Sequence, residues 1–168
     1  MRYLLPVLIF SVLFFSCSSN NRVKPDSSKI EVVTDKELQK IISGRNNKVL
    51  FLNVWATWCA PCIEEFPAIV ELNKRNKNNL EIIALSVDLP SEIESRVAPF
   101  IKKQGASFKI IVADEKSSND MINMLDTTWS GAVPVTFIFD KNGKKQKVLV
   151  GAHSFEQMQA AADSVLAL

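Results

Sequence analysis

Two cysteines separated by two residues, Cys59 and Cys62, are the side chains of this sequence best suited to chemistry. Thiols at this spacing can form and reopen a disulfide, because positions three apart on a helix bring the two Cα atoms to roughly 5 to 6 Å. The attacking group in disulfide exchange is a thiolate, which a helix N-terminus stabilises through its unpaired N–H groups and its dipole. If a helix begins at this motif, Cys59 is the nucleophile and Cys62 is the buried resolving thiol.

Other uses of a cysteine pair fit this sequence less well. A structural zinc site would need further cysteines or histidines at ligand spacing, and His153 is the single histidine. Covalent haem attachment needs a histidine directly after Cys62, where Ile63 stands. A purely structural staple remains an alternative, although so small a loop constrains the unfolded chain little. The thiols could also hold Cu(I) for delivery, although no histidine or methionine lies beside them. No cofactor and no resident metal is predicted.

The first sixteen residues predict a secretory leader. They carry Arg2 and then an apolar run that is too short for a comfortable bilayer span of about 20 residues, and small Ser16 precedes Cys17. This arrangement resembles the bacterial lipobox, in which the cysteine becomes the lipidated first residue after cleavage, although Phe14 stands where leucine is usual. An uncleaved signal anchor is the alternative. Both interpretations predict a protein held outside the cytoplasm at a bacterial membrane, and the first also predicts lipidation of Cys17.

Composition and patterning predict three parts: a leader at 1–16, a flexible polar tether at 17–29 and one globular domain at 30–168. The chain has 168 residues, of which 47% are hydrophobic and 23% charged, as in ordinary globular proteins. Its 20 basic and 18 acidic residues leave no electrostatic footprint for nucleic acid, so no nucleic-acid partner is predicted.

The elements that must position the cysteines alternate between strand and helix. Residues 49–55 are almost continuously apolar, which is typical of a strand covered on both faces, and 63–73 carry apolar residues at helical spacing. The cysteines therefore lie at a strand-to-helix turn. Further strands are expected at 30–33, 80–87, 108–112, 135–139 and 147–150, and further helices at 34–42, 91–104, 118–125 and 154–166. Capping boxes mark the start of three of these helices: Thr34 with Glu37, Ser91 with Glu94, and Ser154 with Gln157. This order predicts an α/β fold in which helices flank a central mixed β-sheet.

Residues 51–62, FLNVWATWCAPC, resemble the active-site signature of the thioredoxin-like superfamily. Pro67 matches the proline that kinks the active-site helix in that superfamily, and 131–137, GAVPVTF, matches the segment whose proline is cis. The resemblance covers about 30–168 and implies a thioredoxin-like fold.

Within this superfamily the chain most resembles the membrane-tethered thiol–disulfide oxidoreductases called TlpA-like or ResA-like. The leader, an extra helix and strand at about 91–112, and Glu65 favour that branch. The resemblance implies a reductant of protein disulfides of the cytochrome c maturation type, with protein disulfides or dithiols as substrates and an unidentified thiol–disulfide electron donor. It also implies that the Val133–Pro134 peptide is cis and that Val133 pairs with an incoming peptide; an ordinary trans proline is the alternative.

Asn53 and Glu65 bear on the direction of the reaction. Minimal thioredoxins carry a buried aspartate where this chain has Asn53, and an amide cannot accept a proton in that way. Glu65 matches a carboxylate of the tethered branch, so it is predicted to move protons or to hold the thiols protonated, because a nearby negative charge raises a thiol pKa. The alternative is that Glu64 and Glu65 only complement the positive helix end. Residues 60–61 offer no side chain that stabilises a thiolate, which favours a negative potential and a reductant.

The three tryptophans and the histidine are assigned by their surroundings. Trp55 is predicted to pack in the core, and Trp58 is predicted to be partly exposed and to face substrate. Trp129 belongs either to the surface near the proline loop or to the core. His153, between the last strand and a helix cap, is interpreted as a loop residue without function.

Overall fold

The computed structural model describes residues 30–44 and 47–168. The predicted leader, the tether and the proposed lipidation residue Cys17 lie outside the described residues. Within the described part of the chain, no helix is both long enough and apolar enough to cross a bilayer.

The centre of the molecule is one six-stranded mixed sheet with the order β1-β4-β3-β2-β5-β6. Its strands are β1 (Glu31–Val33), β2 (Val49–Trp55), β3 (Leu80–Ser86), β4 (Lys109–Ala113), β5 (Val135–Phe139) and β6 (Lys145–Val150). The first four run parallel to one another, while β5 is antiparallel to both β2 and β6. The terminal hairpin therefore makes the sheet mixed, as the sequence predicted.

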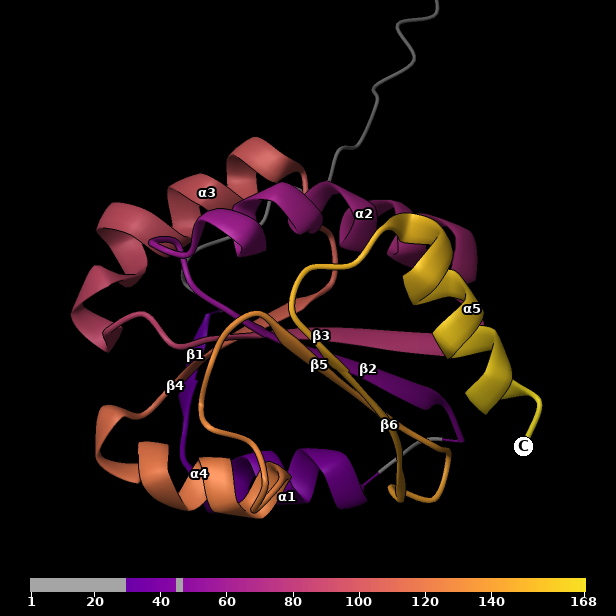
Figure 1. The fold of residues 1–168 in the computed structure, drawn as a ribbon. Coiled ribbons are helices and arrows are strands. Elements are labelled where there is room, and N and C mark those ends of the chain that lie inside the picture. The colour runs from indigo at the N-terminus through magenta and orange to yellow at the C-terminus, as the bar shows by residue number, and fades with distance from the viewer. Residues whose placement is uncertain (1–29, 45–46) are drawn as a thin grey trace, which may run out of the picture.

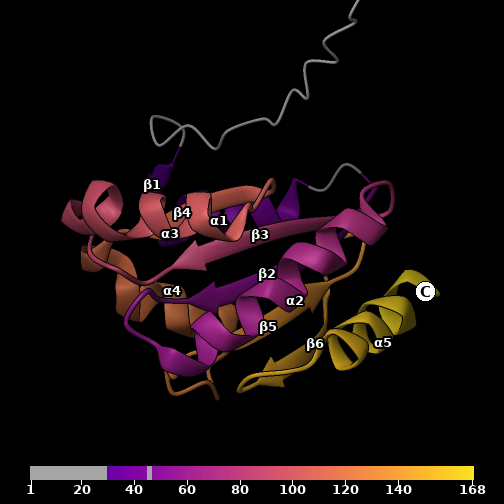
Figure 2. The same cartoon turned by 90° about the horizontal axis from the view of Figure 1, so that it is seen from above.

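Helices cover both faces of this sheet (Figure 1). On one face lie α1 (Asp35–Ser43) and α4 (Ser118–Leu125), and on the other lie α2 (Ala60–Asn76), α3 (Ala98–Gln104) and α5 (Phe155–Leu166). Seen from above, α2 lies between α3 and α5 (Figure 2). This is the predicted thioredoxin-like α/β arrangement, and the helix and strand expected at about 91–112 correspond to α3 and β4.

Every side chain of β2 is buried, and the strand divides the core by its alternation. Leu50, Leu52 and Val54 pack in the cluster that includes α1 and α4. The intervening positions turn toward the other helices, where Phe51 joins a cluster with α2 and α5 and Trp55 joins one with α2 and α3. A strand covered on both faces is the arrangement that the apolar run 49–55 predicted.

Two of the predicted capping boxes are present, and they set the starts of α1 and α5. The hydroxyl of Thr34 accepts from the Glu37 N–H while the Glu37 carboxylate accepts from the Thr34 N–H, and Ser154 and Gln157 repeat the pattern. Each box satisfies backbone donors that a helix start leaves without partners.

The third predicted helix start was wrong. Ser91 does not cap a continuous helix over 91–104; the chain instead forms a 3₁₀ turn (Pro90–Glu92), a π-helical segment (Ile93–Val97) and then α3. Glu92 accepts from the Leu89 N–H in place of the predicted box. The physical reason lies in the two prolines, Pro90 and Pro99. Pro90 begins the first turn one residue before Ser91, and Pro99 can neither donate to the Ser95 carbonyl nor fit its ring against it in a regular α-helix. The segment before Pro99 is π-helical, with the Ala98 N–H bonded to the Ile93 carbonyl five residues back.

Candidate active site

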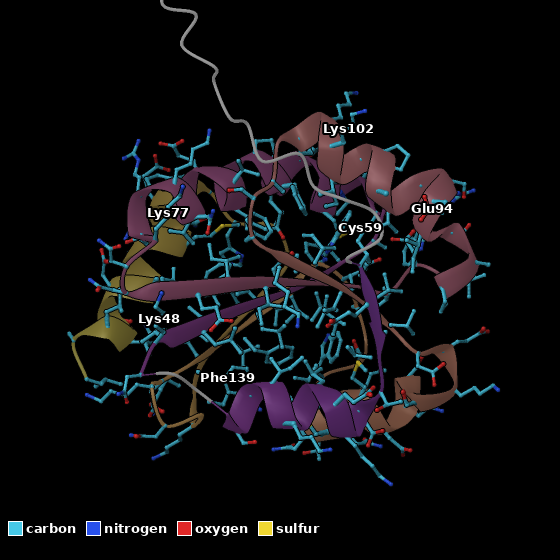
Figure 3. All side chains as sticks on the ribbon, turned by 180° about the vertical axis from the view of Figure 1, so that it is seen from behind. Lys48, Cys59, Lys77, Glu94, Lys102 and Phe139 are labelled. Carbon is cyan, nitrogen blue, oxygen red and sulfur yellow. A yellow bond between two sulfur atoms is a disulfide. The ribbon has the colours of Figure 1, made fainter. Side chains whose placement is uncertain are left out.

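The cysteines stand where β2 ends and α2 begins, at the carboxyl end of the parallel strands. Cys59 is the N-cap of α2, and a turn closed by its N–H and the Ala56 carbonyl leads into it. Cys59 and Cys62 form a disulfide with a Cα–Cα distance of 5.2 Å. Figure 3 shows Cys59 at the opposite end of the sheet from Lys48, which precedes β2.

The helix start is directed at the sulfur of Cys59. The Cys62 N–H donates to Cys59 Sγ over 3.3 Å, so an unpaired donor of the first helical turn reaches the sulfur that the sequence predicts as nucleophile. Cys59 is 6% exposed and Cys62 is 0% exposed. The geometry therefore makes Cys59 the accessible sulfur of the pair.

The loop before β5 brings a backbone carbonyl to the disulfide. The Val133–Pro134 peptide is cis, as predicted, and the Val133 carbonyl oxygen lies 3.6 Å from Cys59 Sγ. Trp129 anchors this loop, because its indole N–H donates to the Ala132 carbonyl over 2.8 Å and its ring meets Phe137 edge-on. Both interpretations of Trp129 thus hold in part, since it packs against the core and supports the proline loop.

Glu65 is buried beneath the cysteines and is 5% exposed, whereas the neighbouring Glu64 is exposed. Glu65 Oε1 accepts from Asn53 Nδ2 over 2.9 Å, and Oε2 accepts from the His153 N–H over 3.1 Å. Burial raises the pKa of Glu65, and the bonds from Asn53 and His153 oppose that rise in part. Glu65 therefore does not merely complement the helix end in solvent, since its carboxyl is held against β2.

His153 and Thr136 belong to this cluster although the sequence indicated no role for either. Asn53 Nδ2 also donates to Thr136 Oγ1 over 3.1 Å. The two residues are directly opposite each other on the antiparallel strands β2 and β5. His153 takes part through its backbone N–H, which no side-chain pattern could reveal. Thr136 lies two residues after Pro134, and this position in the proline segment was its only signal in the sequence.

Asp88 is a second buried carboxyl near the motif, and the sequence-based interpretation missed it. It is 1% exposed and follows β3. One of its oxygens accepts from the Thr57 N–H over 2.9 Å and from the Ser86 hydroxyl over 2.6 Å, and the other accepts from the Thr57 hydroxyl. Asp88 therefore ties the turn that leads into Cys59 to the end of the adjacent strand. An acidic residue directly after a buried strand was the available signal.

Exposed apolar side chains flank the site. Trp58, next to Cys59, is 59% exposed, as predicted for a side chain that faces substrate, and Ile63 and Leu89 are also exposed. Trp55 is fully buried, as predicted, and packs against Phe66 and Phe100. Across residues 30–44 and 47–168, no group of three or more histidine, cysteine, aspartate or glutamate side chains is arranged to hold a metal.

The fold and the disulfide at a helix N-terminus define a class: thiol–disulfide oxidoreductases of the thioredoxin-like fold. The chain belongs to the AhpC/TSA family, whose sequence model matches residues 26–148. Its relatives include the thiol-disulfide oxidoreductase ResA of Bacillus anthracis, 35% identical over 130 residues that cover 76% of this chain and 70% of the relative. The thioredoxin-like protein YneN of Bacillus subtilis is 31% identical over 127 residues, again 76% of this chain and 70% of the relative. The prediction of a ResA-like thiol–disulfide oxidoreductase is confirmed.

Solved structures support the fold. A thiol:disulfide interchange protein from Chlorobium tepidum superposes with a TM-score of 0.62 at 22% identity and covers 84% of this chain and 99% of its own. A thioredoxin-related protein from Neisseria meningitidis serogroup B also gives a TM-score of 0.62, at 24% identity, and covers 73% of this chain and 88% of its own.

Proposed function

We propose that this oxidoreductase reduces protein disulfides outside the cytoplasm and is held at a bacterial membrane by a lipid on Cys17. The observation that carries the catalytic part is the Cys59–Cys62 disulfide at the start of α2, with only Cys59 open to a partner. The leader at 1–16 and the polar tether at 17–29 support the location. The likeness to the ResA-like branch supports cytochrome c maturation as the process served.

The proposed cycle starts from the reduced pair. The Cys59 thiolate attacks one sulfur of a substrate disulfide, a mixed disulfide forms and the first substrate thiolate leaves. Cys62 then loses its proton and attacks Cys59 Sγ, which closes the Cys59–Cys62 disulfide and releases the second substrate thiolate. Two electrons pass from the pair to the substrate, and the two substrate thiolates are protonated by the proton of Cys62 and by the proton that Cys59 released to solvent when it ionised. A separate thiol–disulfide donor restores the reduced pair.

Glu65 is the proposed proton carrier for the buried cysteine. Cys62 is fully buried, so its proton cannot pass directly to solvent, and Glu65 lies one helical turn further along α2. Burial raises the pKa of Glu65 above its ordinary value, which makes its carboxylate a better acceptor for the Cys62 proton. A negative charge at Glu65 would also oppose thiolate formation and favour a reducing pair.

Val133, Pro134 and Trp58 form the proposed docking site for the substrate. The Val133 carbonyl beside Cys59 can pair with an extended substrate segment, and the exposed Trp58 ring can cover its apolar side chains. An extended peptide bound here would present its disulfide to Cys59 Sγ.

The redox potential of the full chain tests the direction of the reaction. We expect a value near that of thioredoxin, about −270 mV, and a value near that of a strong oxidant, about −120 mV, would overturn the reductant assignment. A trapping experiment tests the roles of the two cysteines. Cys62→Ser should accumulate a mixed disulfide between Cys59 and substrate, and Cys59→Ser, the matched control, should not. Stoichiometric binding of Cu(I) by the reduced protein, without turnover of disulfides, would instead favour copper delivery.

The anchor is tested separately. Cells that express the chain are fed a labelled fatty acid, and we expect label and membrane association in the unchanged protein and neither in Cys17→Ser. Label that persists in the Cys17→Ser variant would contradict lipidation at that residue.

A further inference from the structure

Asn53 is bonded on one side only. Its side chain is fully buried, and Nδ2 donates both to Glu65 Oε1 and to Thr136 Oγ1, while Oδ1 has no hydrogen-bond partner among the described residues. A buried acceptor without a partner costs free energy, so its presence in a functional site calls for a physical reason. A half-turn of the amide about its last bond would exchange Oδ1 and Nδ2 and would direct Oδ1 at Glu65 and Thr136.

The backbone of His153 decides which oxygen of Glu65 can carry a proton. The His153 N–H can only donate, and it points at Glu65 Oε2 over 3.1 Å. A neutral Glu65 therefore keeps its carbonyl oxygen at Oε2 and places its hydroxyl at Oε1, which faces Asn53. If Nδ2 still faced this hydroxyl, the hydroxyl proton would have no acceptor on Asn53, whereas a turned amide offers Oδ1 as that acceptor.

We propose that Asn53 is a positioning residue for Glu65 whose amide turns with the protonation state of that carboxyl. With Glu65 ionised, Nδ2 donates to Oε1; with Glu65 neutral, Oδ1 accepts from the Oε1 hydroxyl. Thr136 fits both orientations, because its hydroxyl can accept from Nδ2 or donate to Oδ1. This inference rests on the proton-carrying role proposed for Glu65. It explains how Glu65 stays in place while it gains and loses a proton.

Among the groups around Glu65, the side-chain amide of Asn53 is the one that can change its orientation when Glu65 gains or loses a proton. From β2 and β5 come Asn53 and Thr136, which are neutral. The titratable groups are the His153 imidazole and, once the disulfide opens, the Cys62 thiol one turn earlier on α2. The His153 ring is tied locally, since its Nδ1 lies 2.8 Å from the Gly151 carbonyl and must donate to it. An aspartate in place of Asn53 could take the proton itself, whereas an amide follows Glu65 and leaves the proton there.

Nuclear magnetic resonance of the full oxidised chain, labelled with ¹⁵N, tests the turn directly. The probe is the nuclear Overhauser effect between the Asn53 Nδ2 protons and the Thr136 side chain. We expect it to be strong above the pKa of Glu65 and lost below it, with a midpoint that follows that pKa. An effect of unchanged strength on both sides of that midpoint would overturn the proposal.

Glu65→Gln provides a second, pH-independent test. The His153 N–H must take the new amide oxygen, so the new amide nitrogen faces Asn53 and demands Oδ1. We expect the effect to be lost at every pH in this variant and to titrate normally in Glu64→Gln, the exposed neighbour. A strong effect in Glu65→Gln would contradict the proposal.

Disulfide reduction is measured on the same preparation of the unchanged chain after a small dithiol has reduced its Cys59–Cys62 disulfide and has been removed. Activity with an amide that never turns would overturn the inference and leave the proposed function standing. An amide that turns in a chain without activity would support the inference while removing the proposed function.

Discussion

The two faces of β2 carry different kinds of residue on one strand. Leu50, Leu52 and Val54 face α1 and α4 and pack in a cluster of apolar side chains. On the opposite face, Asn53 and Trp55 lie beneath the start of α2, where Asn53 holds Glu65. A single residue of shift would exchange these faces, because side chains alternate along a strand.

The two faces of β2 contribute to different properties: the apolar face to the stability of the fold, and the other face to the active site. On the apolar face each side chain contributes by burial and close packing, and any polar atom there would be costly. On the active-site face buried polar groups are bonded across elements, as in the bonds of Asn53 to Glu65 and to Thr136, while Asn53 Oδ1 and Trp55 Nε1 have no partner among the described residues. Variants on the two faces should therefore change different properties.

The largest expected loss of stability follows from Leu52→Ala on the apolar face. Leu52 is fully buried, and its truncation leaves a cavity, so we expect the free energy of unfolding to fall by about 3 kcal/mol. Chemical denaturation of the oxidised protein measures the loss, and the redox potential should stay unchanged. Val148→Ala on the exposed edge of β6 is the control, with an expected change within about 0.5 kcal/mol. A Leu52→Ala variant as stable as that control would contradict the comparison.

Asp88→Ala should cost less, about 2 kcal/mol, because it removes a buried hydrogen-bond acceptor without opening a large cavity. Thr57→Val removes one of the bonds to Asp88 and should cost about 1 kcal/mol. Denaturation gives both values, and the rate of disulfide reduction should fall in both, since the turn before Cys59 is loosened. Full activity in Asp88→Ala would show that the anchored turn does not serve the reaction.

Glu65→Gln should produce a smaller effect that depends on pH. Burial raises the pKa of Glu65 above its ordinary value of 4.5 in the folded protein, so the unfolded chain ionises first as pH rises. The stability contributed by protonated Glu65 is thus present below about pH 4.5 and is lost as pH rises through the folded pKa. We expect Glu65→Gln to lack this decline, so its stability relative to the unchanged protein improves as pH rises above about 4.5. The stability of Glu64→Gln should depend on pH as that of the unchanged protein does. If the stability of Glu65→Gln declined by the same amount, the decline would have to come from another titratable group.

The smallest effect on stability is expected for Trp58→Ala, within about 0.5 kcal/mol, because the ring is 59% exposed. Its effect should instead fall on substrate binding. Steady-state assays with a protein disulfide should show a raised KM and a kcat that changes much less. An unchanged KM would remove Trp58 from the docking site.

Much of the fold could be predicted because its signals are local. The apolar run of β2, the capping boxes at Thr34 and Ser154, and the helical spacing of α4 each involve residues a few positions apart. The start of the segment before α3 was misplaced because Pro90, whose fixed φ suits a first helical position, begins the turn one residue before Ser91 and makes Leu89 the N-cap.

The sequence by itself determined the redox pair, its place between a strand and a helix, and the proline segment, because the residue types and their spacing carry that information. Only the tertiary structure decided what surrounds them. The bonds of Glu65 to His153, of Asn53 to Thr136 and of Thr57 to Asp88 join residues 88, 83 and 31 positions apart. Contacts of that range follow from how the strands pair and how α2 packs on the sheet, and no local pattern encodes them.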